Sequence, residues 1–428
     1  REQSMIHVAS GGLLDRRSFL HHGLAFSSVI STGSVMAGTP ASAPNNPEQI
    51  APWMRQAGAI DVPYGTPGAA EQHVVKTATV RAPQEAIFNM WHTPLQHLRG
   101  TITPNGLHFG VHHNGIPAID PAQHRLMIHG LVNKPVQFDL EQLMRFPMES
   151  RITFLECSGN TAPNALSPFA RDESCQDLFG QASCTEWTGI PMRLILQQAG
   201  VKAKATWCVA EGADGGSHTR SIPMNRVMDD AMLALFQNGE RIRPAQGYPM
   251  RLLVPGCEGN MNVKWLHRLE LTDQPAYSKD ESGLYSEVLA NGQIERFTFV
   301  MGVKSVITHP SGQQQLSTPN GYYEISGLAW SGSGKVRQVE VSADGGKTWA
   351  LAKLHGPVLD KSFTRFSIPW HWSGRPATLM SRATDDRGHV QPTREVWKKR
   401  YAAHSFNHYN AIQCWHINRH GRVENVYA

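Results

Sequence analysis

The spacing of apolar positions divides the chain into two parts. Between residues 125 and 270, short strand-like runs alternate with helix-like runs and end at turns rich in Gly, Pro or Asn. This mixture predicts an α+β domain, and residues 167–180 are expected to form a loop. The predicted strands are 125–132, 151–156, 205–210 and 251–255, and the predicted helices are 140–146, 190–199 and 224–235.

After residue 297 the pattern changes to alternating runs separated by turn signals, as at Asp344-Gly345-Gly346. Strands at this spacing predict an immunoglobulin-like β-sandwich. We place the boundary near Glu295, which gives a catalytic domain at 44–295 and a sandwich domain at 296–428. The predicted sandwich strands are 323–330, 336–341, 363–369 and 377–383.

The first residues have the order of an export leader. Arg16-Arg17-Ser18-Phe19-Leu20 is a twin-arginine signature, a weakly apolar run follows to residue 37, and Ala41-Ser42-Ala43 is an A-x-A cleavage site. We expect residues 1–43 to lie outside the fold. Because the twin-arginine route carries folded proteins, it predicts a periplasmic protein with a tightly held prosthetic group.

Charge and cysteine content narrow the class of protein. A net charge of +5, from 40 basic and 35 acidic residues, is too small and too scattered for a nucleic-acid-binding protein. No internal run of about 18 apolar residues predicts a membrane span. None of the 6 cysteines lies in a C-x-x-C pair, which argues against covalent c-type haem and a four-cysteine zinc site. Any haem therefore belongs to another chain. A disulfide between Cys175 and Cys184 stays open, and Cys208 is expected in the core.

Two segments carry candidate chemistry. Cys157 ends a predicted strand at a Ser-Gly-Asn turn, where one soft thiolate suits a soft metal held chiefly by an organic ligand. The strand beginning at Arg251 leads into a glycine turn, and Lys264 follows the turn. Backbone N–H groups and two cations in this arrangement suit an anion.

Together these segments resemble the sulfite oxidase family of molybdopterin enzymes over nearly all of the chain after the leader. Within that family the chain is most similar to the molybdenum subunits of bacterial sulfur-oxidising systems. Residues 154–160 (Phe-Leu-Glu-Cys-Ser-Gly-Asn) match the molybdenum–cysteine segment. Residues 251–266 match the pterin-phosphate segment, and 321–330, 339–346 and 385–392 match the dimerisation domain.

The resemblance implies a role for each matching residue. Cys157 would be the protein's sulfur ligand to molybdenum and a catalytic residue, and His218 would lie near the reacting group. Arg220 is a candidate for substrate charge, as are Arg171 and Arg382. The cofactor is expected to be molybdenum-molybdopterin, and the residues expected to bind it are His113, Cys157, Ser221, Arg251, Gly259, Asn260 and Lys264.

Some positions depart from the family pattern. Val111 and Thr161-Ala162 stand where animal and plant sulfite oxidases carry arginines, and His218 stands where they carry a tyrosine. The expected reaction is oxygen-atom transfer to sulfite or to sulfane sulfur on a carrier protein. The expected electron acceptor is a c-type cytochrome on a separate chain, in a homodimer or hetero-oligomer.

Three other functions stay open. The first is a molybdenum reductase of the same fold acting on sulfoxides, and the second is a cofactor-free binding or assembly protein. The third, a zinc hydrolase, has little support because the 21 histidines show no H-E-x-x-H spacing.

Overall fold

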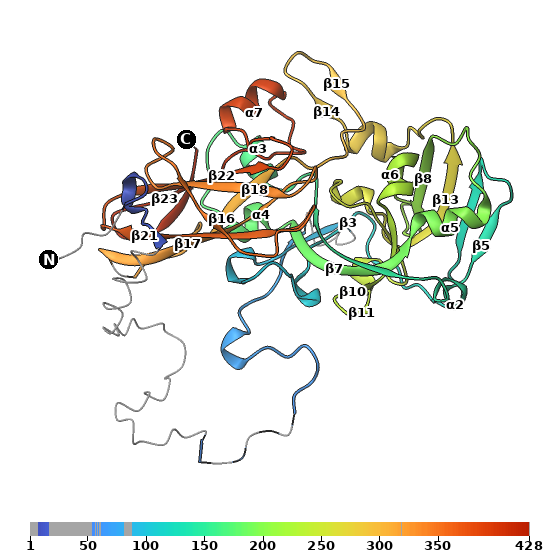
Figure 1. Ribbon diagram of the computed structural model, residues 1–428, viewed down its shortest axis with the longest axis horizontal. Helices are drawn as coiled ribbons and strands as arrows, with labels where there is room; N and C mark the ends of the chain where they lie inside the picture. Colours follow the sequence, from blue (N-terminus) through green and yellow to red (C-terminus); the bar gives the residue numbers. More distant parts are fainter. Residues whose placement is uncertain are drawn as a thin grey trace.

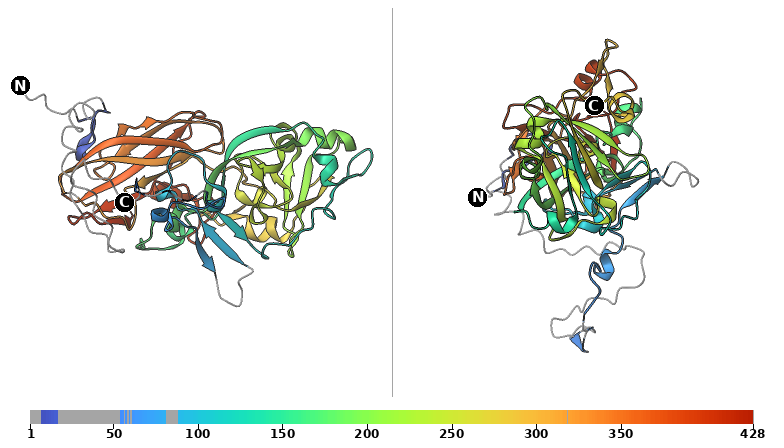
Figure 2. Two further views of the ribbon diagram at one scale, coloured as in Figure 1. Left: turned by 90° about the horizontal axis from the view of Figure 1, so that it is seen from below. Right: turned by 90° about the vertical axis from the view of Figure 1, so that its right-hand side faces the viewer.

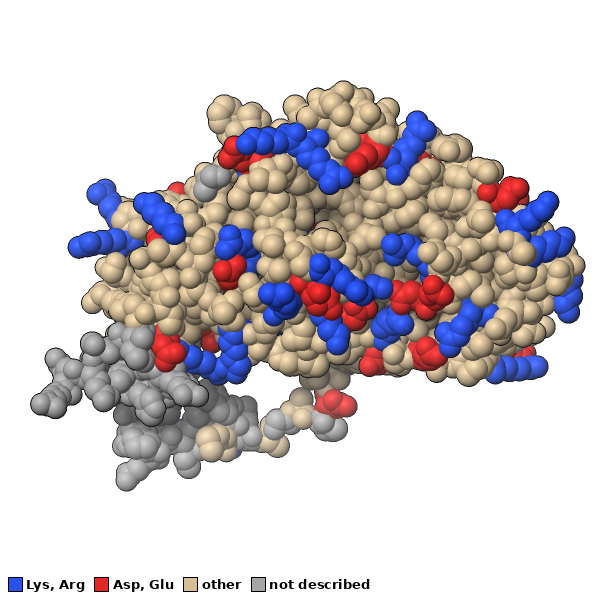
Figure 3. All heavy atoms as spheres, turned by 45° about the horizontal axis from the view of Figure 1, so that its top comes forward, with Lys and Arg blue, Asp and Glu red and all other residues tan. Residues whose placement is uncertain are grey.

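A computed structural model describes residues 7–16, 54–55, 57, 59, 61–80, 88–317 and 319–427. Two sheet-rich bodies lie side by side, one formed by the C-terminal part of the chain and one by the middle (Figures 1 and 2). On the face in Figure 3, Lys and Arg side chains are interspersed with Asp and Glu. None of the helices in the described ranges has the length and hydropathy of a membrane span.

The C-terminal body is the predicted sandwich. Its two sheets face each other across a core that contains the fully buried rings of Trp330, Trp370 and Trp415. All four predicted strands are present, whereas the sequence analysis missed the strands at 304–309, 350–351, 353–354, 414–417 and 423–426. One sheet has the order β16 (Lys304–His309), β17 (Gly321–Trp330), β21 (Thr364–Trp372), β20 (Lys353–Leu354), and the other β19 (Ala350–Leu351), β18 (Val336–Ser342), β22 (Ala377–Asp385), β23 (Cys414–Ile417), β24 (Val423–Val426).

The middle body is the predicted α+β domain. Two sheets enclose an apolar core, against which α5 (Met192–Ala199) and α6 (Met224–Asp229) also pack. The first sheet has the order β11 (Glu240–Arg241), β10 (Met232–Gln237), β7 (Ala182–Pro191), β6 (Glu149–Glu156), with β12 (Arg251–Leu253) also on β10. The second has the order β5 (Val136–Phe138), β4 (Leu126–Gly130), β13 (Leu266–Thr272), β8 (Trp207–Gly212), β9 (Thr219–Pro223).

Smaller elements complete the fold. The sheet β1 (Thr77–Val80), β2 (Asn89–His92), β3 (Gly110–His112) brings residues 110–113 to the middle body. A two-stranded hairpin, β14 (Glu287–Val288) with β15 (Ile294–Glu295), lies where the two bodies join. The remaining helices are α2 (Leu140–Leu143), α3 (Ala162–Leu166), α4 (Cys175–Phe179) and α7 (Arg394–Arg400).

The predicted helix 224–235 is wrong in its second half. Helix α6 stops at Asp229, and Met232–Gln237 forms β10, which pairs with β7 on one side and β12 on the other. Residues 232–235 are apolar on both faces, and such a short run does not distinguish a buried strand from a buried helix. The predicted loop 167–180 also contains helix α4, where Ser174 and Asp177 form a reciprocal cap.

The strand that leads to Cys157 and the elements after it share the core of the sandwich. Phe154, Leu178, Phe179 and Ala182 are buried in the same apolar cluster as Trp330 and Phe363. All six cysteines are free, so the structure has no bond between Cys175 and Cys184. Cys208 is fully buried in the core of the middle body, as expected.

Residues 7–16 depart from the expectation that the whole leader lies outside the fold. They pack on β21, and Leu13 is fully buried in the sandwich core (Figure 1, dark blue). Arg17 and the predicted cleavage site at 41–43 lie outside the described residues.

The β14 hairpin carries a buried carboxyl group that makes stability depend on pH. Glu287 is 2% exposed, its Oε1 has no hydrogen-bond partner, and burial raises its pKa from 4.5 to about 7. Between pH 4.5 and 7 the folded state therefore holds a proton that the unfolded state has lost, so stability falls as pH rises. We expect Glu287→Gln to stabilise the protein by about 2–3 kcal/mol at pH 8 and hardly at pH 4. Urea unfolding at both pH values checks this, and an equal gain at both would contradict it.

Candidate active site

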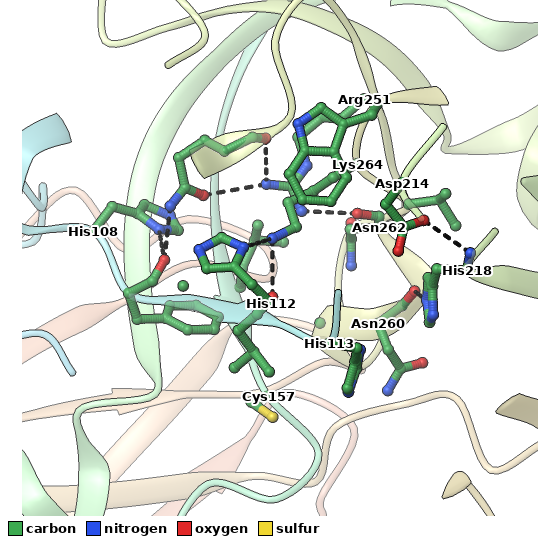
Figure 4. Close-up of a pocket in the computed structure, with 18 of the residues that line it drawn as sticks. His108, His112, His113, Cys157, Asp214, His218, Arg251, Asn260, Asn262 and Lys264 are labelled. Carbon is green, nitrogen blue, oxygen red and sulfur yellow. Dashed lines mark hydrogen bonds between the residues drawn. The ribbon is translucent and has the colours of Figure 1, made fainter. Parts of the chain in front are cut away.

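A pocket in the middle body gathers most of the predicted site residues (Figure 4). The empty space between its lining residues is about 700 Å³, which includes open solvent at its mouth. Seven predicted residues line it, namely His113, Cys157, His218, Arg251, Gly259, Asn260 and Lys264. In the view of Figure 4, Cys157 lies at one end and Arg251 at the other.

The end of β6 fixes Cys157. Its backbone N–H donates to Gln181 O at 2.9 Å, and its carbonyl accepts from the Asn160 N–H at 2.9 Å, which closes the turn. Burial raises the pKa of its thiol to about 11, so the free side chain is protonated near neutral pH. A thiolate at this position needs a cation beside it, which a bound metal supplies.

Strand β12 places Arg251 at the opposite end of the pocket. Its guanidinium donates to Gln246 O at 3.0 Å and to Asn262 O at 2.8 Å, and it stacks on the Trp187 ring at 5.1 Å. Burial lowers its pKa to about 9. No carboxylate pairs with Arg251 among the described residues.

Lys264 lies beside Arg251 and is likewise a cation without a paired carboxylate among the described residues. Its ammonium donates to Val111 O at 2.9 Å and approaches His112 Nδ1 at 2.8 Å. Burial, together with the charge of Arg251, lowers its pKa well below the ordinary value. Burial, followed by the charge of Lys264, lowers the pKa of His112 to about 2, so the neutral His112 ring accepts a hydrogen bond from the Lys264 ammonium.

Unsatisfied polar atoms indicate what this end of the pocket receives. Nε of Arg251 and Nε2 of His108 are buried without a hydrogen-bond partner in the structure. Because the neutral His108 ring donates from Nδ1 to Phe109 O, its Nε2 can only accept, and the unused donor is the Nε–H of Arg251. This donor and the two cations are costly to leave without an anion. A phosphate group satisfies both needs, so the residues present fit the phosphate of a pterin cofactor.

The Cys157 end is formed by histidine, tyrosine and asparagine side chains, and His218 Nδ1 also lies 3.5 Å from an Asp280 carboxylate oxygen. His113 and His218 stack with ring centroids 5.9 Å apart, and Tyr285 Oη lies 3.4 Å from His113 Nε2. His218 Nε2 lies 2.9 Å from Asn260 O, while both side-chain polar atoms of Asn260 are buried and unpartnered. Burial, followed by His218, lowers the pKa of His113 to about 4, so His113 is uncharged near pH 7.

Arg220 and Ser221, both predicted at the site, do not line the pocket. Arg220 is fully buried and donates to Glu258 Oε1 at 3.0 Å and Glu281 Oε1 at 2.8 Å. Its guanidinium lies behind the Tyr285 ring, at 4.8 Å. The Ser221 hydroxyl is engaged with the backbone of Ala276. Neither side chain is available to a ligand in the pocket, so the proposed roles lack structural support.

The other two candidate arginines are also remote from the pocket. Arg382 is paired with Glu340 at 2.8 Å and stacks on Trp349 in the sandwich. Arg171 is exposed on the segment between α3 and α4. The sequence analysis therefore named no cation that faces Cys157.

The ion cluster around Arg220 leads to a prediction about stability. We expect Arg220→Met to cost about 3–5 kcal/mol, because it leaves Glu258 and Glu281 buried without their cation. The exposed Arg171→Met is the matched control and is expected to change stability by less than about 0.5 kcal/mol. Urea unfolding of the whole chain measures both. A loss of turnover in Arg220→Met at unchanged stability would restore Arg220 as a substrate-binding residue.

Comparisons with known proteins agree with this geometry. The family model of the oxidoreductase molybdopterin binding domain matches residues 113–279, and that of the Mo-co oxidoreductase dimerisation domain matches 295–414. The crystal structure of the sulfane dehydrogenase SoxCD from Paracoccus pantotrophus matches with 42% identity and a TM-score of 0.86, over 89% of this chain and 97% of that chain. The chain belongs to the sulfite oxidase family of molybdopterin enzymes.

Curated relatives in this family are more distant. Mitochondrial sulfite oxidase of Mus musculus is 30% identical over 76% of this chain and 64% of its own length. NADH nitrate reductase of Solanum lycopersicum is 31% identical over 71% of this chain, which spans only 38% of the reductase. The predicted family, fold class and molybdenum cofactor are confirmed, and the dimerisation domain supports the predicted oligomer.

The sequence analysis missed several residues of this sulfite oxidase-type pocket. His108 and His112 flank the predicted His113 but carried no separate signal. Gln246 and Asn262 hold Arg251, and Tyr285 comes from a segment that no motif marked.

Proposed function

We propose that this chain is a periplasmic molybdenum dehydrogenase that oxidises sulfane sulfur carried on a partner molecule. Its electrons pass to a c-type cytochrome on a separate chain. The observation that carries the proposal is the cation-poor Cys157 end of the pocket, together with the likeness to a sulfane dehydrogenase structure. The twin-arginine signature supports the periplasmic location.

The pocket's charges favour a sulfane over free sulfite. Val111 replaces a family arginine, and Arg220 is neutralised by two carboxylates. Sulfite is a dianion and needs positive side chains that offset its charge. A sulfane sulfur bound to a larger molecule brings less charge, so neutral groups such as His113, Asn260 and Tyr285 are sufficient to orient it.

When bound, the cofactor supplies two-electron oxygen-atom transfer. The residues of this chain would hold the cofactor and surround the substrate. Arg251 and Lys264 hold the anionic end of the cofactor, and Cys157 supplies one sulfur ligand. His113, His218 and Tyr285 surround the reacting end and would offer hydrogen-bonding atoms to substrate or water.

The electron count per sulfur tests the proposal directly. Oxidation of a persulfide to an S-sulfonate uses three waters and releases six protons and six electrons, whereas oxidation of sulfite to sulfate uses one water and releases two of each. Protein from a host that makes molybdopterin is assayed with glutathione persulfide and with sulfite, each with cytochrome c as acceptor. We expect kcat/KM for the persulfide to be at least about tenfold higher, with six cytochromes reduced per sulfur.

Three other results would overturn the proposal. A preference for sulfite, with two cytochromes reduced per sulfur, indicates a sulfite dehydrogenase. Turnover of a sulfoxide with a reduced viologen dye, without turnover of either sulfur donor, indicates a reductase of the same fold. The similarity to NADH nitrate reductases keeps the reductase as the competing function. A preparation without molybdenum would indicate a binding protein.

A further inference from the structure

Residues 7–16, which include the first arginine of the twin-arginine signature, occupy a fitted site on the sandwich. Leu13 is fully buried and Leu14 is 2% exposed. The Leu14 N–H donates to Pro369 O at 3.0 Å, and the indole Nε1 of Trp370 donates to Gly11 O at 2.7 Å. The segment therefore contributes to the sandwich core as well as to backbone pairing.

Two glycines allow this close approach. Gly11 and Gly12 have φ angles of +77° and +95°, which side-chain-bearing residues rarely adopt. A Cβ on Gly12 would lie 2.1 Å from His371 O, and one on Gly11 would lie 2.7 Å from Ala343 O. The site therefore selects this Gly-Gly-Leu sequence instead of accepting any apolar strand.

The site exists only when the sandwich is folded. One wall is the strand β21 from Pro369 to His371, and the other is the turn after β18, where Thr348 Oγ1 accepts the Ser10 N–H at 3.0 Å. These two walls are brought together by the sandwich and not by the local sequence. Arg16 lies next to this contact, exposed, at a surface cavity that Glu324 and Lys353 also line.

We propose that residues 7–16 are an intramolecular ligand of the folded sandwich that restrains the export leader, so that an export receptor must displace them before it can bind the arginine pair. The proposal rests on the leader prediction and not on the proposed enzymatic function. A receptor that binds only the released leader has an apparent affinity lowered by the released fraction. If about a tenth of the precursor is released, undocking raises that affinity about tenfold.

The test uses the full precursor chain and three variants. Leu13→Asp places a charge in the buried site, and Gly12→Val introduces a side chain against His371 O. Val8→Asp is the matched control, because Val8 lies in the same segment but is 43% exposed. Hydrogen exchange of residues 11–14 reports docking, and binding to membrane vesicles that contain the twin-arginine translocase reports leader availability.

We expect amide protection in the wild type and in Val8→Asp, reduced at least about tenfold in the two docking variants. Both docking variants should bind the vesicles about tenfold more tightly than Val8→Asp. Rapid exchange of residues 11–14 in the wild type overturns the docking. Equal vesicle affinity of all four proteins, with docking present, overturns the restraint. Because neither measurement involves molybdenum or turnover, these outcomes are separate from failure of the proposed function.

Discussion

Replacement of Cys157 by serine is expected to reduce turnover at least about a hundredfold, a larger loss than that usual for residues that only support a metal ligand. The reason is the chemistry of the ligand atom. A thiolate is a soft donor that suits molybdenum held by a pterin, whereas a hydroxyl is a hard donor and loses its proton much less readily. Metal content, the visible absorption of the thiolate–metal bond and turnover of the loaded enzyme measure the effect.

Cys208→Ser is the matched control for this change. Cys208 is fully buried, but it lies in the core of the middle body and does not line the pocket. The same sulfur-to-oxygen exchange there is expected to lower stability by about 1–3 kcal/mol and to leave turnover per molybdenum unchanged. Unaltered absorption and turnover in the Cys157 variant would contradict its assignment as the metal's ligand.

Replacement of Lys264 by methionine is expected to act in opposite directions on the empty and the loaded protein. Hydrogen bonds from a charged donor to a phosphate are worth about 1.5–3 kcal/mol, so retention of the pterin should fall about tenfold to a hundredfold. The empty protein should become more stable, because a half-buried ammonium without a carboxylate partner is removed. Pterin fluorescence after release measures retention, and urea unfolding measures stability.

The stabilisation of the empty protein should depend on pH in a defined direction. Because burial lowers the pKa of Lys264 below 10.5, the unfolded state binds more protons than the folded state between the two pKa values. Stability of the wild type therefore rises with pH in that window, and Lys264→Met should reduce this rise. The exposed Lys347→Met, on the sandwich, is the control and should change neither retention nor the pH dependence. Equal pterin retention in both variants would contradict a cofactor role for Lys264.

The residues that the sequence predicted well lie in contiguous motifs. Cys157 and Lys264 each stand in a run whose turn residues fix the local backbone, so position in the chain indicates position in the site. The role of Arg220 could not be predicted from its position in the chain. Its carboxylate partners, Glu258 and Glu281, are 38 and 61 residues away, and only the folded chain reveals that its charge is already neutralised.

Strand β10 shows a similar limit for secondary structure. Its two faces pack into two different apolar clusters, Leu233 and Leu235 into one and Met232 and Ala234 into the other, so the alternation that distinguishes a strand from a helix is lost. Strand β18 was easier to predict, because its buried residues partly alternate with exposed or half-buried ones, as in a strand with one solvent-facing side. Tyr285 could not be predicted, because no nearby residue marks its segment as part of the pocket.

The packing of Phe154, Leu178, Phe179 and Ala182 into the sandwich affects how the enzyme can be divided or recombined. Family boundaries suggest a cut near residue 295, but a fragment ending there would expose these side chains to water and would release the strand that leads to Cys157. A chimera that takes its C-terminal half from a relative would need matching substitutions at these four positions. We therefore expect the two domains to be exchangeable between relatives only when they are moved together. A chimera that joins one domain to a mismatched partner domain is expected to lose metal binding.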